Sequence, residues 1–385
     1  MSNNELHTDL RTAVRELCSR FPDSYWRELD AREAYPEDFV KTLTETGYLA
    51  ALIPEKFGGS GLGIAEASII LEEVNRSGGN SAACHAQMYI MGTLLRHGSK
   101  AQQAHYLPKI ASGELRLQAF GVTEPTTGTD TTQMKTMAVR KGDRYVVNGQ
   151  KVWISRVEYS DLMLLVARTT PLEEVKKKTE GLTTLLVDLK HAVGNGMTVH
   201  PIRAMINHAT TEVFFDNLEV PVENRIGEEG KGFRYLLDGL NPERILIAAE
   251  AVGIGRNAVD RAARYARDRV VFGRPIGQNQ AIQHPLARSW AELEAGWLLA
   301  LKAAWAYDAG QPSGAAANAA KYFASEVAFT ACERAVMTHG GMGYAKEFQV
   351  ERLLREVLIP RIAPVSQEMV LCYLAERVLD LPRSY

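Results

Sequence analysis

The chain has 385 residues, and its 44 basic and 46 acidic side chains leave a formal net charge of −2 at neutral pH. A chain of this length exceeds the size at which one hydrophobic core keeps growing, so we expect two or three subdomains. The balanced charge includes no basic tract, which excludes the electrostatic signature of proteins that bind nucleic acid or anionic lipid.

The cysteines and the N-terminus indicate the cellular setting. Cys18, Cys84, Cys332 and Cys372 are widely spaced and show no C-x-x-C pattern, so we expect reduced core residues in a reducing compartment, the cytoplasm. The first twenty residues lack the basic and apolar regions of a signal peptide, and no window approaches the ~18 consecutive apolar residues of a membrane span. We therefore expect a soluble, unprocessed chain without membrane insertion.

Hydrophobic spacing divides the chain into three parts. From Glu5 to about Glu114 apolar residues recur at helical spacing, interrupted by glycine-rich turns at 58–61 and 77–80. From Gln118 to about Glu223 the period is two, with β-branched and aromatic residues. Beyond residues 228–230 the helical pattern returns, with alanine-rich stretches. The pattern predicts an α+β fold, with helical residues 1–117, a β-barrel-like or sandwich domain over 118–225, and helical residues 226–385.

Two segments of the predicted β domain suggest a binding surface. In QAFGVTEPTTGTD (118–130), Pro125 ends regular structure and a small polar turn exposes backbone N–H groups and hydroxyls. In VVNGQKVWIS (146–155), Asn148-Gly149 predicts a hairpin turn, and Trp153 and Ser155 are predicted at a strand end. An indole plane and hydroxyl donors suit a flat aromatic ligand such as a flavin, although each motif alone is common in ordinary turns and strands.

Together these segments resemble the acyl-CoA dehydrogenase family, in which a TEP turn and a glycine-containing hydroxyl turn precede NGxKxWI. The resemblance covers almost the whole chain and implies FAD as the cofactor, at the junction of N-terminal helices, a middle β domain and a C-terminal four-helix bundle. In this part of the chain it implies cofactor contacts from Phe120, Val122, Thr123, Gly128, Thr129, Trp153 and Ser155.

Three C-terminal motifs have both ordinary and functional interpretations. Gly253-x-Gly255 follows a helical run and lacks the third glycine of a dinucleotide fingerprint, so we interpret it as small residues at a helix crossing. The glycines of 339–344 favour either a tight turn or a backbone that approaches a ligand. Arg269, beyond a predicted helix end, suits a pyrophosphate or a surface ion pair.

The resemblance assigns these motifs to the cofactor. It implies that Arg269, Phe272 and Gln280 reach the flavin of a neighbouring subunit, which makes the protein an obligate homo-oligomer, expected to be a tetramer. It also implies that the remaining flavin contacts come from Met337, Gly340, Gly341 and Ser366.

The catalytic base does not occupy its usual position. Most family members carry this glutamate near the C-terminus before a Gly-Thr pair, where this chain has Pro364, Val365 and Ser366. A minority, including isovaleryl- and long-chain acyl-CoA dehydrogenases, carries the base on an earlier helix before an arginine, which implies Glu243 here. Asn241-Pro242-Glu243 also has the composition of a helix start, with asparagine as the N-cap.

The resemblance also assigns substrate contacts and exposes a departure. It implies that Asn241, Arg244 and Thr129 bind substrate. In relatives the N–H at position 364 helps to polarise the thioester carbonyl, and Pro364 has none. Either a ribityl hydroxyl and a neighbouring amide suffice, or the register shifts so that Ala363 is the donor. Met337 in place of glutamine and Arg156 in place of asparagine are lesser departures.

The activity implied by the resemblance is the FAD-dependent α,β-dehydrogenation of an acyl-CoA to the trans-2-enoyl-CoA, with electrons leaving to an electron-transfer flavoprotein. The alternatives are an oxidase or desulfinase-like enzyme of the same fold, or a non-catalytic acyl-CoA- or flavin-binding subunit. Residues 80–95 carry no arginine to pair with a distal carboxylate, which argues against a dicarboxylyl substrate. Met88 and Met91 either line an apolar floor of the acyl site or belong to the ordinary core.

Overall fold

The computed structural model describes residues 3–384, and these residues form two compact units. One unit, here the helical unit, combines residues from Met1–Arg32, Gly63–Ser81 and Asn241–Tyr385. The other, the sheet unit, combines Glu33–Leu62 and Ala82–Leu240. Each unit therefore brings together segments that are far apart in the sequence.

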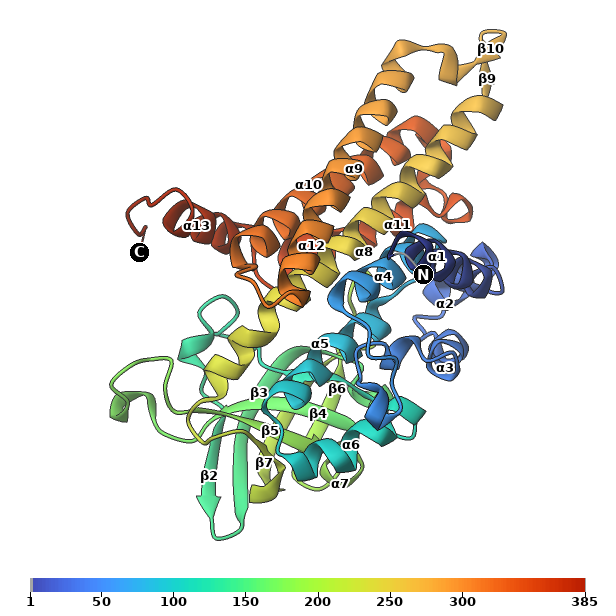
Figure 1. Cartoon of the computed structure of the whole chain (residues 1–385). Helices are drawn as coiled ribbons and strands as arrows, with labels where there is room; N and C mark the ends of the chain where they lie inside the picture. Colours follow the sequence, from blue (N-terminus) through green and yellow to red (C-terminus); the bar gives the residue numbers. More distant parts are fainter. Residues whose placement is uncertain (1–2, 385) are drawn as a thin grey trace. The chain divides into compact units, whose positions relative to one another are not determined.

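Helices occupy the first third of the chain, as the apolar spacing predicts (Figure 1). They are α1 (Asn3–Cys18), α2 (Asp23–Ala31), α3 (Glu37–Glu45), α4 (Ile64–Arg76), α5 (Ala82–His97) and α6 (Lys100–Ser112). Helix α6 begins at a capping box, in which Gln102 N–H donates to Ser99 Oγ and Ser99 N–H donates to Gln102 Oε1. Met88 and Met91 on α5 are completely buried, and Met91 packs in a core of helix and strand residues.

The middle of the chain forms one sheet in the order β6-β7-β3-β2-β4-β5-β8, with β1 paired to β4. Its strands are β1 (Leu117–Gly121), β2 (Met137–Lys141), β3 (Arg144–Ser155), β4 (Leu162–Arg168), β5 (Leu182–Asp188), β6 (Met197–Pro201), β7 (Thr210–Pro221) and β8 (Arg225–Ile226). A short helix, α7 (Leu189–Ala192), follows β5. The predicted start of β structure near residue 118 is therefore confirmed.

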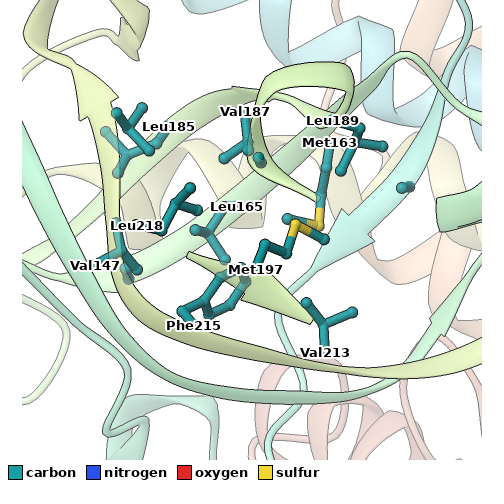
Figure 2. Close-up of a cluster of buried hydrophobic side chains, with 14 of the residues drawn as sticks. Val147, Met163, Leu165, Leu185, Val187, Leu189, Met197, Val213, Phe215 and Leu218 are labelled. Atoms are coloured by element: carbon teal, nitrogen blue, oxygen red, sulfur yellow. The ribbon is translucent and has the colours of Figure 1, made fainter. Parts of the chain in front are cut away.

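Alternate residues of these strands fill the core of the sheet unit. Figure 2 shows side chains of β3, β4, β5, β6 and β7 pointing toward one another, including Val147, Leu165 and Phe215. Because successive side chains of a strand point to opposite faces, this packing leaves the other face of β3 free to present polar and aromatic groups. The core thus gives the candidate cofactor residues a rigid support.

The C-terminal third is helical again, with α9 and α10 packed side by side (Figure 1). The helices are α8 (Gly232–Asp268), α9 (Gln280–Asp308), α10 (Gly314–His339), α11 (Val350–Glu356), α12 (Leu358–Ile362) and α13 (Gln367–Arg377). With the N-terminal helices and the middle sheet, they confirm the predicted α+β fold. Residues 232–240 of α8 belong to the sheet unit and residues 241–268 to the helical unit.

Small residues allow α8 to pack closely within the helical unit. A Cβ at Gly253 would lie 2.3 Å from the carbonyl oxygen of Glu72 on α4. A Cβ at Gly255 would lie 2.6 Å from Leu293 on α9 and 3.1 Å from Ala328 on α10. Such distances leave no room for a larger side chain, so the interpretation of this pair as a helix crossing is confirmed.

Ion pairs anchor the same helix. Arg256 on α8 lies 2.6 Å from carboxylate oxygens of both Glu72 and Glu294. Arg261, farther along α8, donates to both carboxylate oxygens of Asp23 on α2. Bidentate and shared contacts of this kind fix orientation as well as distance. These ion pairs fix the position, within the helical unit, of the part of α8 that follows Glu243.

The cysteines are free, and Cys18, Cys84 and Cys332 are buried while Cys372 is partly exposed. The prediction of core positions is therefore confirmed for Cys18, Cys84 and Cys332 and is wrong for Cys372. Within residues 3–384, no helix taken alone has the length and apolar character needed to cross a membrane; only the bent pair Val350–Ile362 and Gln367–Arg377, taken together, meets that requirement.

Candidate active site

The turn after β1 lies against β3 in the sheet unit. The N–H of Val152 on β3 donates to the carbonyl oxygen of Thr123 at 2.9 Å. The two segments that the sequence indicates as a binding surface are thus neighbours. The predicted cofactor residues of this unit all lie on or beside β1 and β3: Phe120, Val122, Thr123, Gly128, Thr129, Trp153 and Ser155.

A buried ion pair connects these two segments. Lys151 on β3 is completely buried, and its Nζ lies 2.9 Å from Glu124 Oε1 and 2.9 Å from the carbonyl oxygen of Val122. Glu124 also accepts backbone N–H groups of Lys135 at 2.6 Å and Thr136 at 2.9 Å. One carboxylate therefore fixes the turn, the start of β2 and the strand that carries Trp153.

The electrostatics of this pair favour the ionised glutamate. Burial alone would raise the pKa of Glu124, but the Lys151 charge and the N–H groups of Lys135 and Thr136 outweigh it, so this pKa is lowered. Burial lowers the pKa of Lys151 to about 8, against the opposing charge of Glu124. The pair is charged at neutral pH.

Trp153 projects outward from an irregular point of β3. The pairing of β3 with β7 shifts register between Lys151 and Ile154, which marks a bulge. Trp153 has φ +62°, rare for a bulky residue, and its side chain is 60% exposed. A bulge that turns an indole toward solvent, on a rigid strand, is typical of a residue held ready for a ligand.

The predicted hairpin turn at Asn148-Gly149 is wrong. Strand β3 continues through both residues, and the reversal between β2 and β3 occurs at Gly142, with φ +63°. Gly149 is required for another reason, because a Cβ there would lie 2.7 Å from the Cα of Thr136. Close approach of β2 explains the glycine. The prediction that Ser155 ends the strand is confirmed.

Hydroxyl donors near Trp153 remain available to a ligand. Ser155 Oγ accepts the side-chain N–H of Asn207 at 2.8 Å and lies 3.4 Å from Thr210 Oγ1, so its own proton can point toward a ligand. Gly128 and Thr129 are exposed, and a Cβ at Gly128 would meet no atom within 4 Å. The turn is open to solvent where the sequence predicts ligand contacts.

Glu243 is a buried carboxylate in the middle of α8, 7% exposed. The alternative interpretation of Asn241-Pro242-Glu243 as a helix start is wrong, because α8 begins at Gly232 and Pro242 lies inside it. A proline there removes one backbone hydrogen bond without ending the helix. The acidic residue therefore does not serve as a helix-terminal charge.

Arg244 lies beside this carboxylate with unused hydrogen-bonding capacity. Its Nη1 donates to Asn241 Oδ1 at 3.1 Å. Its Nε is buried and has no hydrogen-bond partner among residues 3–384. Burial lowers the pKa of Arg244, against the opposing charges of Glu243 and Tyr373. A buried donor without a partner is costly and indicates a group that a ligand satisfies.

The segment that usually carries the base follows α12. The N–H of Ala363 donates to the carbonyl oxygen of Ile359 at 2.9 Å. The alternative in which Ala363 supplies the thioester donor is therefore not supported, because this N–H already has a partner. Ser366 caps α13 by accepting the N–H of Met369. Pro364 lies between them and offers no N–H.

Arg269, Phe272 and Gln280 lie around an exposed hairpin of the helical unit. Strands β9 (Val270–Val271) and β10 (Arg274–Pro275) flank Phe272-Gly273, and both turn residues have positive φ, as type I′ turns require. Phe272 is fully exposed. Arg269 follows the end of α8, as predicted, and Gln280 is the first residue of α9.

The end of α10 presents a second open surface. Met337 is 74% exposed, and a Cβ at Gly340 or Gly341 would meet no atom within 4 Å. Gly343, by contrast, is buried, and a Cβ there would lie 2.4 Å from the carbonyl oxygen of Val336. Packing within residues 3–384 therefore requires neither of the first two glycines. Gly340 has a φ of +59°, which a tight turn explains, whereas Gly341 favours the interpretation that the backbone allows a ligand to approach.

Models of all three acyl-CoA dehydrogenase domains match the chain, with the N-terminal domain over residues 4–114, the middle domain over 119–218 and the C-terminal domain over 230–379. The acyl-CoA dehydrogenase FadE12 of Mycobacterium tuberculosis is 35% identical over 379 residues, 98% of this chain and 96% of that protein. Cyclohex-1-ene-1-carbonyl-CoA dehydrogenase of Syntrophus aciditrophicus is 36% identical over 355 residues, 91% of this chain and 83% of that protein.

The fold agrees with these sequence matches. The butyryl-CoA dehydrogenase of Megasphaera elsdenii superimposes with a TM-score of 0.91 at 29% identity, over 98% of this chain and 99% of that one. The chain belongs to the acyl-CoA dehydrogenase family. It is accordingly an oxidoreductase that acts on acyl-CoA with FAD as cofactor.

The residues present in each unit fit this cofactor. In the sheet unit, an exposed indole and nearby hydroxyls suit a flavin ring. In the helical unit, the open glycine backbones and the exposed Arg269 suit a pyrophosphate.

Three buried charged residues, each in the same unit as some of the predicted site residues, were not identified by sequence reasoning: Lys151, Arg168 and Lys321. Lys151 belongs to the NGxKxWI motif, and this motif was the sequence signal from which it could have been identified. Arg168 is buried on β4 and donates to carbonyl oxygens of Thr132 and Met134, which fixes the turn after Thr129. Lys321 lies within an alanine-rich stretch, where a single lysine resembles a solvent-exposed position.

Proposed function

We propose that Glu243 removes the pro-R α-proton of an acyl-CoA, giving the trans-2-enoyl-CoA, and that the electrons leave to an electron-transfer flavoprotein. The observation that supports this assignment is a buried glutamate beside Arg244, in a chain whose position 364 is proline. Bound FAD supplies the acceptor for the β-hydride. Anaerobic addition of an acyl-CoA tests the proposal, because loss of the oxidised flavin absorption must accompany enoyl-CoA formation.

The surroundings of Glu243 suit a general base. Proton transfer from carbon requires a carboxylate within reach of the α-carbon and shielded from bulk water. Glu243 is buried, and its position inside α8 keeps its backbone rigid. Glu243 is not part of a helix start, as the local sequence suggests, because α8 begins about three turns earlier.

Arg244 is proposed to bind the thioester or pantetheine part of the substrate. Its buried Nε–H has no partner among residues 3–384, while Nη1 is held by Asn241. A donor positioned in this way can provide the hydrogen bond that Pro364 is unable to donate. An S-alkyl-CoA thioether, which lacks the carbonyl, is the matched probe for this contact. Arg244→Lys is expected to weaken acyl-CoA binding more than thioether binding.

Cofactor contacts are proposed for residues of each unit, taken by itself. From the sheet unit the contacts are those of Phe120, Val122, Thr123, Gly128, Thr129, Trp153 and Ser155. From the helical unit they are those of Arg269, Phe272, Gln280, Met337, Gly340, Gly341 and Ser366, with Arg269, Phe272 and Gln280 acting on the flavin of a neighbouring subunit. Large exposed apolar groups such as Phe272 and Met337 support a homo-oligomer, which we propose is a tetramer.

Arg269→Ala is expected to weaken FAD retention and subunit association together. Loss of a charge-assisted hydrogen bond costs ~1.5–3 kcal/mol, or about one to two decades of affinity. FAD content after gel filtration and mass by light scattering measure both effects. Arg267→Ala, an exposed arginine one half-turn earlier, is the control. Loss of FAD with unchanged association would instead place Arg269 on the cofactor of its own subunit.

The substrate is proposed to be an α- or β-branched or cyclic acyl-CoA. A base on α8 frees the volume that a glutamate at position 364 would fill, and Pro364 stiffens that wall because its φ is fixed. The similarity to a dehydrogenase named for a cyclic acyl-CoA supports the same class.

The Pro364→Gly variant tests this preference. We expect the wild type to have a higher kcat/KM for branched or cyclic than for straight acyl-CoAs, and we expect the variant to lose much of that selectivity because the wall becomes flexible. Steady-state assays with chain-matched substrates measure both values. A preference of the wild type for straight chains by more than about tenfold, ~1.4 kcal/mol, would refute the proposal that the acyl site fits branched or cyclic groups.

A further inference from the structure

Lys321 is a buried cation near the proposed base, and the proposed mechanism gives it no role. It lies on α10 with no exposed surface. Lysine is almost never fully buried unless its charge is compensated. Its Nζ donates to the carbonyl oxygen of Val365 at 2.5 Å, in the segment that usually carries the family's base.

The same face of α10 holds the rest of this segment. Ser325, one turn after Lys321, donates to the carbonyl oxygen of Pro360 at 3.0 Å. Glu326 accepts the Nε–H of Arg361 at 2.7 Å and also pairs with Gln367. Lys321 and Ser325 are four residues apart and lie on one side of α10. Together with Glu326, they hold residues 360–367 against this helix.

The start of α10 also adjoins the substrate residues of α8. A Cβ at Gly314 would lie 3.9 Å from Asn241 Nδ2, and Asn241 holds Arg244. Asn318, on α10 one turn before Lys321, has a buried Oδ1 without a hydrogen-bond partner among residues 3–384. Helix α10 therefore contributes polar groups to the same neighbourhood as Glu243 and Arg244.

Charged groups from three helices act on Lys321. Burial lowers the pKa of Lys321 to about 8, and Arg244 on α8 acts in the same direction. Glu368 on α13, Glu243 on α8 and Glu326 on α10 oppose this shift. At neutral pH the ammonium form therefore prevails, and its charge interacts with the Glu243 carboxylate.

We infer that Lys321 is a positioning residue, which holds the Val365 segment in place and places a positive charge near the Glu243 carboxylate. This inference rests on the proposed role of Glu243. A neutral donor such as glutamine would satisfy the Val365 carbonyl without the penalty of a buried ammonium. The charge itself, rather than the hydrogen bond alone, is thus the property that the site uses.

Lys321→Gln, Lys321→Arg and Lys321→Met separate the two roles. Glutamine retains a donor but removes the charge, arginine retains the charge, and methionine removes both. The rate of flavin reduction by a saturating acyl-CoA is measured between pH 6 and pH 9, with Lys302→Gln, an exposed lysine of α9, as the surface control.

In Lys321→Gln we expect the acidic limb of the rate profile to move to higher pH, and each unit of this shift lowers the rate on that limb about tenfold. We also expect the wild-type ionisation near pH 8 to disappear from this profile. Lys321→Arg is expected to keep the acidic limb in its wild-type position, and Lys321→Met to lose substrate affinity in addition.

A second readout does not depend on activity. A lysine whose pKa is lowered in the folded state is neutral there but protonated in the unfolded chain between about pH 8 and pH 10.4. The unfolded state then binds more protons, so stability rises with pH across this window. The melting temperature of the wild type relative to Lys321→Gln is therefore expected to increase from pH 7 to pH 10.

The outcomes are distinguishable from failure of the proposed function. An unchanged pH profile in Lys321→Gln, or a loss of stability alone, would overturn the role of Lys321 while leaving Glu243 as the base. If Glu243→Gln itself retained the wild-type rate, the proposed function would fail first, whatever the behaviour of Lys321.

Discussion

Replacing Glu243 by glutamine is expected to abolish reduction of the bound flavin by acyl-CoA, with a loss of about three orders of magnitude or more. Glutamine is nearly isosteric and still forms hydrogen bonds, so packing of α8 is preserved while the basic group is lost. General base catalysis typically contributes about 10²–10⁴-fold. Stopped-flow reduction under anaerobic conditions measures the rate, and the flavin absorption spectrum measures FAD content, which is expected to stay at the wild-type level.

Glu250→Gln is the matched control, because Glu250 is equally buried on the same helix, two turns later. Glu250 accepts a hydrogen bond from Ser81 at 2.7 Å, and the proposal gives it no part in proton transfer. Near-wild-type reduction in Glu243→Gln, or an equal loss in both variants, would contradict the assignment and require another carboxylate as the base.

Lys151→Met is expected to destabilise the protein strongly and to reduce FAD retention. The substitution leaves Glu124 buried without its cation, and removal of one partner of a buried ion pair costs about 3–5 kcal/mol. It also loosens the connection between the TEP turn and the strand that carries Trp153. Urea unfolding at neutral pH measures the first effect, and FAD content after gel filtration measures the second.

The double variant Lys151→Met/Glu124→Gln is expected to recover part of this loss, because no uncompensated charge remains.

The pKa of Glu124 is lowered in the folded state, so the stability it contributes is present above the usual glutamate value of about 4.3 and is lost as the pH falls below it. The difference between wild type and Lys151→Met should therefore shrink on acidification. A single variant as stable as the wild type would show that the pair is not a structural connection.

The helical and sheet segments could be predicted because their hydrophobic periods are long and regular. The Asn148-Gly149 turn could not be predicted correctly, since the same dipeptide suits a tight turn and a crowded strand. What decides between them is Thr136, directly before β2, whose Cα leaves no space for a Cβ at Gly149. That contact depends on strand pairing, which a local pattern does not contain.

The start of α8 illustrates a similar limit. Asn241-Pro242-Glu243 satisfies the local rules for a helix start, yet the helix begins at Gly232. Packing of the residues before Pro242 outweighs the hydrogen bond that the proline removes, and sequence rules do not weigh the two effects. Locating Glu243 inside the helix required the structure, whereas proposing it as the base depended on the family resemblance and on its position before Arg244.

The burial of the two lysines was not predicted for a different reason. Lys151 and Lys321 occur in segments where a single lysine usually faces solvent, and no property of the lysine itself reports burial. Their partners are Glu124 and the Val365 carbonyl, 27 and 44 residues away in the sequence. Only the tertiary fold brings these groups together.

Anaerobic titration of the purified flavoprotein with straight, branched and cyclic acyl-CoAs tests the central claim most directly. We predict that at least one branched or cyclic acyl-CoA removes the oxidised flavin absorption in proportion to the enoyl-CoA formed. We also predict that an electron-transfer flavoprotein restores that absorption faster than dioxygen does. If no acyl-CoA reduced the flavin, or if dioxygen reoxidised it at the faster rate, this chain would not be a dehydrogenase of the proposed kind.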